Sequence, residues 1–512
     1  MRGAVAAGHP LSAAAGARAL EEGGNAVDAC VAAAFAAWVA ESPLTGPGAG
    51  GFGLVVPASG AARVADFFVS TPGLGRPAPS GAEMHAIDVG FGGDSETTQV
   101  FRIGEASCAV PGSAAGLAAI HAAHGRLPWR ELLQPAIELA REGLELTRPQ
   151  AHLHAILDLI LRHSDEGRRL YSAPNGARLG PGDVLRLPEL GETLALIAEE
   201  GAAPLYRGEL AGRIAETVAA GGGKLTADDL AAYEVVWRDP VRVRYLGHEV
   251  ISNPVPSSGG TLIAYGLALL ERTGRGGAGS AEAIESLAEV MREQTRARDG
   301  TLDERLLEEE RLAEAVERIR ANAPGPGEHA PAGGTTHVSA VDAEGNAAAV
   351  SSSTGSGSGV IVPGTGIHLN NMLGEYDLVA GAPAEPGHRL TSMMAPTVVR
   401  GGEGPRLVVG SAGSVRLRGA IMQVIANVVA HGLDVWTAID APRVHLDEPH
   451  VHCEGGFDPE QLDRVQELGW DVVRWRRRNL FFGGTNAVEV RPDGQLAAAG
   501  DARRGGDGIV VS

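Results

Sequence analysis

The sequence has few cysteines, few aromatic residues and no excess of positive charge. Its three cysteines, Cys30, Cys108 and Cys453, are too few and too scattered for a disulfide framework, so nothing requires an oxidising compartment. The net charge is −20, and no stripe of Lys or Arg could neutralise phosphates, which argues against nucleic acid or an anionic membrane as partner. The densest basic cluster, "WRRRN" at 475–479, is expected to be solvated surface.

Long apolar runs are also absent. No stretch of about 18 apolar residues occurs, and the N-terminal residues lack the apolar core of a signal peptide. We therefore expect a cytoplasmic protein without a membrane span, unless a leader segment has been removed.

Hydrophobic residues nevertheless make up 44% of the 512 positions, enough for a large core, and length alone favours two or three domains. Two helices are predicted within 9–42, the first capped near Ser12 and ended by Gly23 and Gly24, the second beginning at Asn25. Further helices are predicted at 113–124, 129–141, 185–200, 207–220, 281–321 and 417–431. The charged stretch 281–321 is predicted to present a solvated face.

The character of the sequence changes at a linker. Residues 322–334, "NAPGPGEHAPAGG", contain too much Pro and Gly for a helix or a central strand. Beyond them the chain is rich in strand-forming segments, such as "THVSAV", "AAAVSSS", "RLVVGSA" and "AVEVRP". Composition therefore divides the chain into a helix-rich part, 1–334, and a strand-rich part, 335–512.

The first strand after the linker is predicted to form a hairpin. "TTHVSAV" and "AAAVSSS" flank the turn "DAEGN", in which Gly345 and Asn346 are expected to supply positive φ angles. If Val341 pairs with Ala347, the antiparallel register places Thr335 opposite Ser353, within reach of a hydroxyl-to-hydroxyl hydrogen bond. The competing interpretation is an ordinary edge strand with Thr chosen for its β-propensity.

Breakage of the bond between Gly334 and Thr335 would give Thr335 special chemistry. Its free α-amino group, with a pKa of about 7.7–8.0, would be partly neutral at physiological pH and could act as the base for its own hydroxyl. An N-terminal threonine of this kind is an activated nucleophile.

A series of motifs carries a resemblance to a known family. "TTHVSAVDAEGN", "GTGIHLNNM", "RLTSMMAPT", "VVGSAGS", "LDVWTAIDAPRVH" and "GTNAVEVRPDGQLAAAGDARRGGDG" resemble, in order, the small subunit of the γ-glutamyltranspeptidases, which are N-terminal nucleophile hydrolases. "HPLSAAAGARALEEGGNAVDA", "CAVPGSAAGLAAIHAAHGRLPWRELLQPAIELAREG", "LTADDLAAYEVVWRDPVRVRYLGHEV" and "PVPSSGG" resemble the large subunit. The resemblance implies an α+β fold, a four-layer αββα sandwich, made as one precursor that cleaves itself before Thr335. It replaces the expectation of several domains by one unit in which large and small subunits form a heterodimer.

The resemblance also implies roles for single residues. The nucleophile matches Thr335, which follows Gly334 at the cleavage site, and its hydroxyl partner matches Ser353. The pair whose backbone N–H groups form the oxyanion hole matches Gly413 and Ser414. The residues that bind the α-carboxylate and the α-amino group of the substrate match Thr391, Ser392 and Glu375. No cofactor and no metal are implied.

Recognition of a glutamyl group is eroded in this sequence. Where the family has an arginine for the substrate carboxylate, "DFFVSTPG" places Phe68, and the usual acidic pair is Gly374 and Glu375. The loop after Ser353 is short and lacks the asparagine of the family, and the stretch between Glu375 and Thr391 is too short for the family's lid. Loss of a bidentate Arg–carboxylate contact is a large change, so a changed substrate is expected.

Other candidate sites have simpler explanations. "GPGAGGFG" at 46–53 precedes a strand rather than joining a strand to a helix, which argues against a dinucleotide site and indicates close backbone packing. "HLDEPHVHCE" at 445–454 could contribute zinc ligands, but a surface strand with incidental histidines is the preferred interpretation. His337 is expected to be structural, and Asp501 is expected to anchor a turn through a salt bridge.

Three functions remain open at this stage. The first is a self-cleaving γ-glutamyltranspeptidase-like enzyme that hydrolyses or transfers the acyl group of a small amide through an acyl-enzyme on Thr335. The second is an amidase or acylase of the same superfamily without γ-glutamyl preference. The third is an uncleaved, non-catalytic relative that serves as a binding protein.

Overall fold

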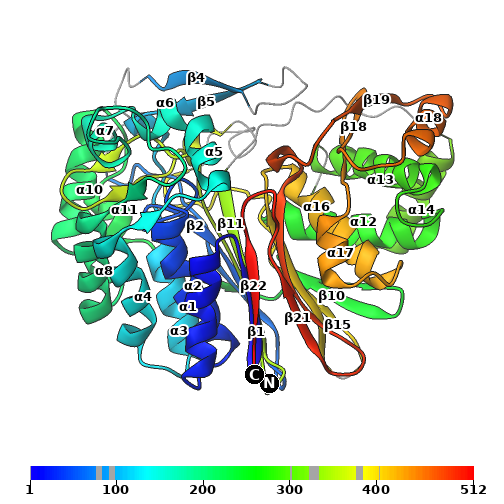
Figure 1. Cartoon of the computed structure of the whole chain (residues 1–512), viewed down its shortest axis with the longest axis horizontal. Helices are drawn as coiled ribbons and strands as arrows, with labels where there is room; N and C mark the ends of the chain where they lie inside the picture. The colour runs from blue at the N-terminus through cyan, green and yellow to red at the C-terminus, as the bar shows by residue number, and fades with distance from the viewer. Residues whose placement is uncertain are drawn as a thin grey trace.

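The computed structural model describes residues 2–75, 83–90, 98–299, 302–321, 334–375, 385–402 and 404–512. Two sheets lie face to face at the centre, and helices cover the outer side of each, which confirms the predicted four-layer αββα arrangement (Figure 1). The two chain ends meet at one edge of the sheets, where the Arg2 amide donates to the Val511 carbonyl at 2.8 Å.

The larger sheet mixes strands from both sides of residue 334. Its order is β22, β1, β11, β12, β2, β3, β8. The strands are β1 (Gly3–Ala7), β2 (Gly50–Val56), β3 (Arg63–Phe67), β8 (Val236–Arg238), β11 (Gly334–Asp342), β12 (Ala347–Gly355) and β22 (Asp507–Val511). Because β11 lies between β1 and β12, the residue that follows the linker is at the centre of the sheet and not at an edge.

The second sheet has the order β21, β20, β16, β15, β10, β9. These strands are β9 (Val241–Tyr245), β10 (His248–Ser252), β15 (Thr397–Arg400), β16 (Pro405–Ala412), β20 (Gly484–Val490) and β21 (Leu496–Ala499). Short strands outside the two main sheets are β4 (His85–Gly90), β5 (Thr98–Ile103), β6 (Leu144–Glu145), β7 (Val184–Leu185), β13 (Ile361–Val362), β14 (Ile367–His368), β17 (Val444–Asp447), β18 (His450–Cys453) and β19 (Asp471–Arg474).

Helices on the side of the larger sheet come from the first half of the chain (Figure 1). They are α1 (Pro10–Glu21), α2 (Ala26–Ala40), α3 (Ser113–His124), α4 (Trp129–Glu142), α5 (Arg148–Ile156), α6 (Asp158–Leu161), α7 (Asp165–Leu170), α8 (Pro188–Glu200), α9 (Ala203–Tyr206), α10 (Glu209–Ala220) and α11 (Ala227–Ala231). The second sheet is covered by α12 (Ser258–Thr273), α13 (Ala281–Asp299), α14 (Glu309–Arg320), α16 (Arg416–Val429), α17 (Val435–Asp440) and α18 (Pro459–Glu467). Short 3-10 helices are η1 (Glu105–Ser107), η2 (Glu304–Leu307), η3 (Met372–Gly374) and η4 (Leu480–Phe482).

Alternation along the strands explains the two cores. Val5 and Ala7 of β1 pack toward α1 and α2, whereas Ala4 and Ala6 face the second sheet. Because successive side chains of a strand point to opposite faces, a strand buried on both sides is apolar throughout, as "GAVAA" is.

Most predicted helices are confirmed, with two corrections. Asn25 caps α2 through a capping box with Asp28, as its sequence indicates. The first helix, however, is capped by His9 and begins two residues before Ser12. The Ser12 hydroxyl instead donates to the Glu41 carboxylate at 3.2 Å.

In the described residues of 281–321, the α-helices α13 and α14 are separate, and the 3-10 helix η2 lies between them. The prediction of a solvated face is wrong for α13, because residues such as Glu293 and Gln294 are buried in it. Glu293 is tolerated there because Arg296 and Arg318 both pair with its carboxylate.

The hairpin has the predicted register over most of its length. Val341 pairs with Ala347 and Thr336 with Ser352, but a bulge follows, so that Gly334 pairs with Gly355. The turn uses a positive φ only at Gly345 and not at Asn346.

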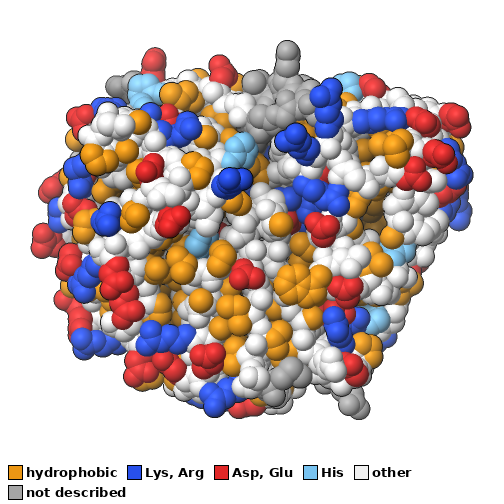
Figure 2. All heavy atoms as spheres, in the orientation of Figure 1, with side chains coloured by type: hydrophobic (Ala, Val, Ile, Leu, Met, Phe, Trp, Pro, Cys, Tyr) orange, Lys and Arg blue, Asp and Glu red, His pale blue; other side chains and the backbone are white. Residues whose placement is uncertain are grey.

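Two surface expectations can be compared with the structure. Arg476 and Arg477 of the basic cluster are exposed, as expected, whereas Trp475 of the same cluster is buried. On the face of the molecule drawn in Figure 2, Lys and Arg side chains are interspersed with Asp and Glu. Within the described ranges, no helix is both long and apolar enough to cross a membrane.

The C-terminal turn is held by a buried ion-pair network, as the sequence predicts for Asp501. Arg443 donates to Asp501 at 2.6 Å and Arg503 to Glu454 at 2.5 Å, and all four side chains are at most 3% exposed. Burial alone would raise the pKa of Asp501, but Arg443 and Arg503 outweigh it and lower the pKa to about 2.

Replacement of Asp501 by Ala should therefore lower the free energy of unfolding. The change leaves Arg443 buried without its carboxylate, which costs about 3–5 kcal/mol in the free energy of unfolding. Asp239→Ala, which removes an exposed pair with Arg63, should cost less than about 1 kcal/mol. Chemical denaturation of both variants measures the difference, and equal stabilities would contradict the assignment.

Candidate active site

The junction between Gly334 and Thr335 lies at the end of the central strand β11. Thr335 is 4% exposed and occupies the bulge between the pairs Gly334–Gly355 and Thr336–Ser352. The extra residue of this bulge is on β12, where Ser353 and Thr354 together face Thr335, and bulges of this kind often re-aim side chains beside a site. Thr335 lines a cavity of about 40 Å³ between the two sheets.

Ser353 contacts this junction in a way that the sequence did not indicate. Because of the bulge, Ser353 does not pair directly with Thr335; its hydroxyl donates to the Gly334 carbonyl oxygen and accepts from the Gly355 amide at 2.9 Å. A donor on this oxygen withdraws electrons from the carbonyl carbon of the Gly334–Thr335 bond. That carbon is thereby made a better target for a nucleophile.

A strained loop lies on the other side of the cavity. Between β16 and α16, Gly413 has φ +131° and Ser414 has φ +54°, a left-handed conformation that is uncommon for serine. Gly413 packs on Gly483, where a Cβ would come within 2.9 Å of the Gly483 Cα. Among the described residues, neither the Gly413 amide nor the Ser414 amide has a hydrogen-bond acceptor. Ser414 lines the cavity and Gly413, which precedes it, does not, so the expected oxyanion pair is only partly brought to the cavity wall. Unpaired N–H groups at such a turn are suitable donors for an oxyanion.

Most of the predicted substrate residues meet at the same cavity. The wall contains Phe68, Ser353, Ser392, Ser414 and Glu375 together with Thr335. Thr391 is exposed and does not line the cavity, so the structure brings only one of the predicted pair, Ser392, to the site.

Several lining residues were missed from the sequence. They are Gly355, Met372, Met393, Met394 and Leu417. Met393 and Met394 directly follow Ser392 in the motif "RLTSMMAPT", so the motif itself contained the signal. With Phe68, they make one side of the cavity apolar.

Ser392 is held from behind by the motif "PVPSSGG". Its carbonyl accepts from the hydroxyls of Ser257 and Ser258, each at 3.0 Å, and its own hydroxyl accepts from the Met394 amide at 3.1 Å. This clamp keeps the Ser392 hydroxyl at a fixed place in the wall.

Glu375 supplies the carboxylate of the cavity. It is 7% exposed, and its Oε1 lies so close to Gly355 that a Cβ there would come within 3.0 Å. The stretch between Glu375 and Thr391 is expected to be too short for the family's lid, and residues 376–384 of it lie outside the described residues.

Phe68, which is expected at the place of the family's arginine, lines the cavity. It is 1% exposed and stacks on Phe52 with ring centroids 5.6 Å apart. Arg389, three residues before Ser392, does not supply the missing arginine. Its guanidinium lies 4.3 Å from the centre of the Tyr233 ring and 3.5 Å from the Asp66 carboxylate. Within the described part of the chain, no arginine or lysine lines the cavity.

Neither His337 nor the histidines of the segment 445–454 line the cavity at Thr335. His337 contacts the hydroxyls of Ser351 and Ser339 at 2.8 and 2.9 Å, and burial lowers its pKa to about 3, so it is neutral. In β18, the ring of His452 accepts from Trp475 at 3.2 Å. The described residues contain no group of three or more His, Cys, Asp or Glu arranged to hold a metal ion.

The glycine-rich stretch 46–53 serves close packing, as predicted. A Cβ at Gly51 would lie 2.1 Å from the Ser351 carbonyl oxygen, and one at Gly48 would lie 2.3 Å from the His368 carbonyl oxygen. Gly50 pairs with Ser353, so these glycines let β2 support the site directly.

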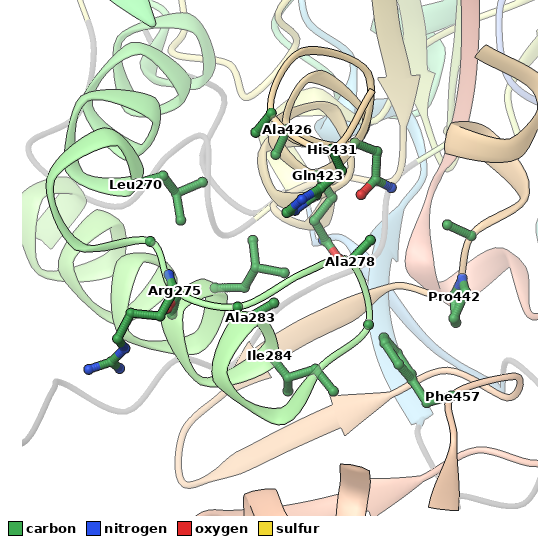
Figure 3. A pocket seen from close by; sticks show the side chains of 18 of the residues that line it. Leu270, Arg275, Ala278, Ala283, Ile284, Gln423, Ala426, His431, Pro442 and Phe457 are labelled. Atoms are coloured by element: carbon green, nitrogen blue, oxygen red, sulfur yellow. Dashed lines mark hydrogen bonds between the residues drawn. The ribbon is translucent and has the colours of Figure 1, made fainter. Parts of the chain in front are cut away.

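A larger cavity of about 570 Å³ lies elsewhere, between α12, α13 and α16 (Figure 3). Its wall includes Leu270, Ile284, Ala426 and Phe457. The hydroxyl of Ser286, also in this wall, donates to a carbonyl of its own helix. The Ser286 hydroxyl is therefore already engaged, and the smaller cavity at Thr335 is the stronger candidate for the active site.

Comparison with known proteins agrees with this geometry. The model of the family described as gamma-glutamyltranspeptidase matches residues 12–511. The acylase ACY 1 proenzyme of Pseudomonas sp. (strain V22) is 32% identical over 100% of this chain and 94% of its own length. The glutathione hydrolase proenzyme of Escherichia coli (strain K12) is 31% identical over 94% of this chain and 87% of its own.

Solved structures show the same relation. A cephalosporin acylase from Bacillus halodurans superposes with a TM-score of 0.84 at 26% identity, covering 99% of this chain and 95% of that one. The gamma-glutamyltranspeptidase of Helicobacter pylori gives a TM-score of 0.52 at 28% identity, with 62% of this chain and 90% of that one covered. Since the family match spans nearly the whole sequence and the acylase proenzyme aligns end to end, the chain belongs to the gamma-glutamyltranspeptidase family of self-cleaving amide hydrolases.

Proposed function

We propose that the chain cleaves itself between Gly334 and Thr335 and that the resulting N-terminal Thr335 hydrolyses a small amide with an apolar acyl part. Residues 1–334 and 335–512 are then the two subunits of a heterodimer. The observation that carries the proposal is the Ser353 hydroxyl on the Gly334 carbonyl, beside a buried Thr335 that lines the same cavity. Ser414 lies in the wall of this cavity, and its amide and that of the preceding Gly413 are the proposed oxyanion donors.

Maturation follows from this arrangement. The Thr335 hydroxyl oxygen attacks the Gly334 carbonyl carbon and its proton passes to the Thr335 nitrogen. The C–N bond then breaks, which leaves an ester on the hydroxyl oxygen and a free α-amine on Thr335. Water then hydrolyses the ester and releases the Gly334 carboxylate. The continuous chain leaves a cavity of only about 40 Å³, room for about one water, so a substrate enters only after cleavage.

Turnover repeats the same chemistry on an external amide. The new α-amine of Thr335 takes the hydroxyl proton, the hydroxyl oxygen attacks the amide carbon, and the Gly413 and Ser414 amides donate to the oxyanion. The leaving amine takes the proton, and water hydrolyses the acyl-enzyme. The Ser353 hydroxyl, freed from the Gly334 carbonyl, becomes a donor for the Thr335 oxygen.

The wall of the cavity favours an acylase over a glutamyl-specific enzyme. Phe68, Met372, Met393, Met394 and Leu417 offer apolar contacts to an acyl chain. A γ-glutamyl amide is the second candidate, favoured by Glu375, which can pair with an ammonium group, and by Ser392, which can donate to a carboxylate. Without an arginine in the wall, binding of that carboxylate is weak.

Maturation can be tested at the proposed nucleophile. Thr335→Ala lacks the attacking oxygen, so it should stay one chain of 512 residues without activity, whereas the natural sequence should yield two fragments on a denaturing gel. Thr335→Ser keeps a hydroxyl and should still cleave. Two fragments from Thr335→Ala would refute the assignment of the nucleophile, and an uncleaved, inactive natural chain would favour a binding protein.

The second prediction concerns Ser353. Ser353→Ala removes the donor on the Gly334 carbonyl and should slow self-cleavage by about 5- to 150-fold, the effect of about 1–3 kcal/mol. Ser353→Thr retains a hydroxyl and serves as the control. A time course of cleavage by intact mass measures both, and an unchanged rate in Ser353→Ala would show that this hydrogen bond has no role.

The third prediction concerns substrate preference. Phe68→Arg places a guanidinium in the apolar wall and should raise kcat/KM for a γ-glutamyl anilide, relative to an aliphatic acyl anilide, by about tenfold or more. Phe68→Leu, which keeps the wall apolar, should leave this ratio within a few-fold of the natural enzyme. A natural enzyme that already prefers the γ-glutamyl anilide strongly would overturn the acylase assignment.

A further inference from the structure

On the opposite side of β11 from the cavity, a buried carboxylate lies beside the cleavage site. Glu41, the residue that ends α2, is 6% exposed, and its Oε2 accepts a hydrogen bond of 2.6 Å from the Thr336 hydroxyl. Its Oε1 accepts from Ser12 at 3.2 Å. Thr336 is the residue directly after the candidate nucleophile, so Glu41 holds the strand at the position where the bulge begins.

The segment that follows Glu41 holds the same part of the hairpin. The Leu44 carbonyl accepts from the Thr354 amide at 2.9 Å, and the Thr45 hydroxyl contacts the Ser352 hydroxyl at 2.8 Å. The end of α2 therefore clamps both strands that form the bulge. Of these contacts, only the one through Glu41 involves a group whose charge can change.

The surroundings leave no room for the carboxylate to move away. A Cβ at Gly8 would lie 2.2 Å from the Glu41 Oε2 and 2.9 Å from the Thr336 Oγ1. Behind Glu41, a small cavity of about 20 Å³ is lined by His154 and Arg504 among others. This is space for about one water molecule, and much of its wall is apolar, with Pro43, Leu44 and Leu153, so the hydrogen bond to Thr336 is a main polar contact of the carboxylate.

Glu41 is the group in this cluster that titrates near neutral pH. Burial raises the pKa of Glu41 to about 7, although the hydrogen bonds from Thr336 and Ser12 and the charge of Arg504 act against it. Burial also lowers the pKa of His9 and of His154 to about 4 and that of Arg504 to about 10. The titratable groups placed around this carboxylate by α1, α5, the C-terminal turn and β22 are His9, His154, Arg503, Arg504 and Asp507.

We propose that Glu41 is a positioning residue for self-cleavage: in its ionised form it fixes Thr336, and through Thr336 the bulge that presents Thr335 to the Gly334 carbonyl. The inference rests on the self-cleavage proposed above. A hydrogen bond from a hydroxyl to a carboxylate is stronger than one to a neutral acceptor, so the bulge is held more firmly when Glu41 is charged. Self-cleavage should then be limited below about pH 7 by protonation of Glu41.

Glu41→Gln separates this role from a merely structural one. Glutamine still accepts a hydrogen bond from Thr336 but does not titrate, so it imitates the protonated form at every pH. The natural chain and Glu41→Gln are isolated in denaturant and diluted into native buffers between pH 5.5 and 8.5. Conversion to residues 1–334 and 335–512 is followed by intact mass.

We expect the ratio of the two cleavage rates to be near 1 at pH 5.5 and to rise to about tenfold at pH 8.5. The uncleaved chain has no α-amine at Thr335, so that group does not contribute to this profile. Glu289→Gln is the matched control, because Glu289 also has a raised pKa through burial but lies on α13 beside Arg275. Its ratio to the natural chain should remain near 1 at every pH.

Ser12→Ala provides a second test that does not depend on how well Glu41→Gln folds. Loss of the Ser12 hydrogen bond, which helps to lower the pKa of Glu41, should move the midpoint of the natural profile to higher pH by about half a unit. A ratio that does not change with pH in Glu41→Gln, or an unmoved midpoint in Ser12→Ala, would overturn the inference. If the natural chain fails to cleave at any pH, the proposed function fails, and this inference fails with it.

Discussion

The hydrogen bond from Ser353 to the Gly334 carbonyl depends on a bulge at the centre of a buried sheet. A regular ladder would place Thr335 opposite Ser353 and leave the Gly334 carbonyl in the backbone pairing. The pair Gly334–Gly355 breaks that register, and Gly355, with φ +71°, adopts a conformation that favours glycine. The regular pair between Thr335 and Ser353 is lost, and the Ser353 hydroxyl instead donates to the Gly334 carbonyl, beside the buried Thr335.

The bulge lies in a sheet that interleaves strands from both sides of residue 334. β11, which begins at the junction, is flanked by β1 from the N-terminal end and by β12, and β12 pairs in turn with β2. Cleavage would leave β11 covered on both edges and packed on both faces, so the sheet does not depend on the peptide bond before Thr335. A central strand therefore suits a self-cleaving protein better than an edge strand, which would fray once its end was freed.

Local signals predicted much of the fold, and tertiary contacts account for the errors. The start of the second helix at Asn25 was predicted correctly, since its cap partner Asp28 is local, whereas Ser12 was misjudged because its hydroxyl is used by the distant Glu41. The hairpin register followed from the turn, but the bulge depends on Gly355, which gives no periodic signal. The charged helix α13 was wrongly expected to be solvated. Its buried Glu293 is paired with Arg318 of another helix, and residue spacing within α13 cannot reveal such a partner.

The site shows the same division between motif and environment. Motif matches located Thr335, Ser353, Ser392 and Glu375, and the structure brings them to one cavity. They did not indicate Thr391 as a surface residue, because adjacent positions in an extended segment point to opposite sides.

Nor did the motifs indicate Glu41, whose hydrogen-bond partner Thr336 lies 295 positions along the chain. Burying a carboxylate that becomes charged near neutral pH opposes folding: the raised pKa means that its stabilising, protonated form is lost as the pH rises through about 7. A glutamine would satisfy the same hydroxyls without that cost. The presence of an ionisable group at this point is therefore better explained by the chemistry of the neighbouring bond than by the stability of the sheet.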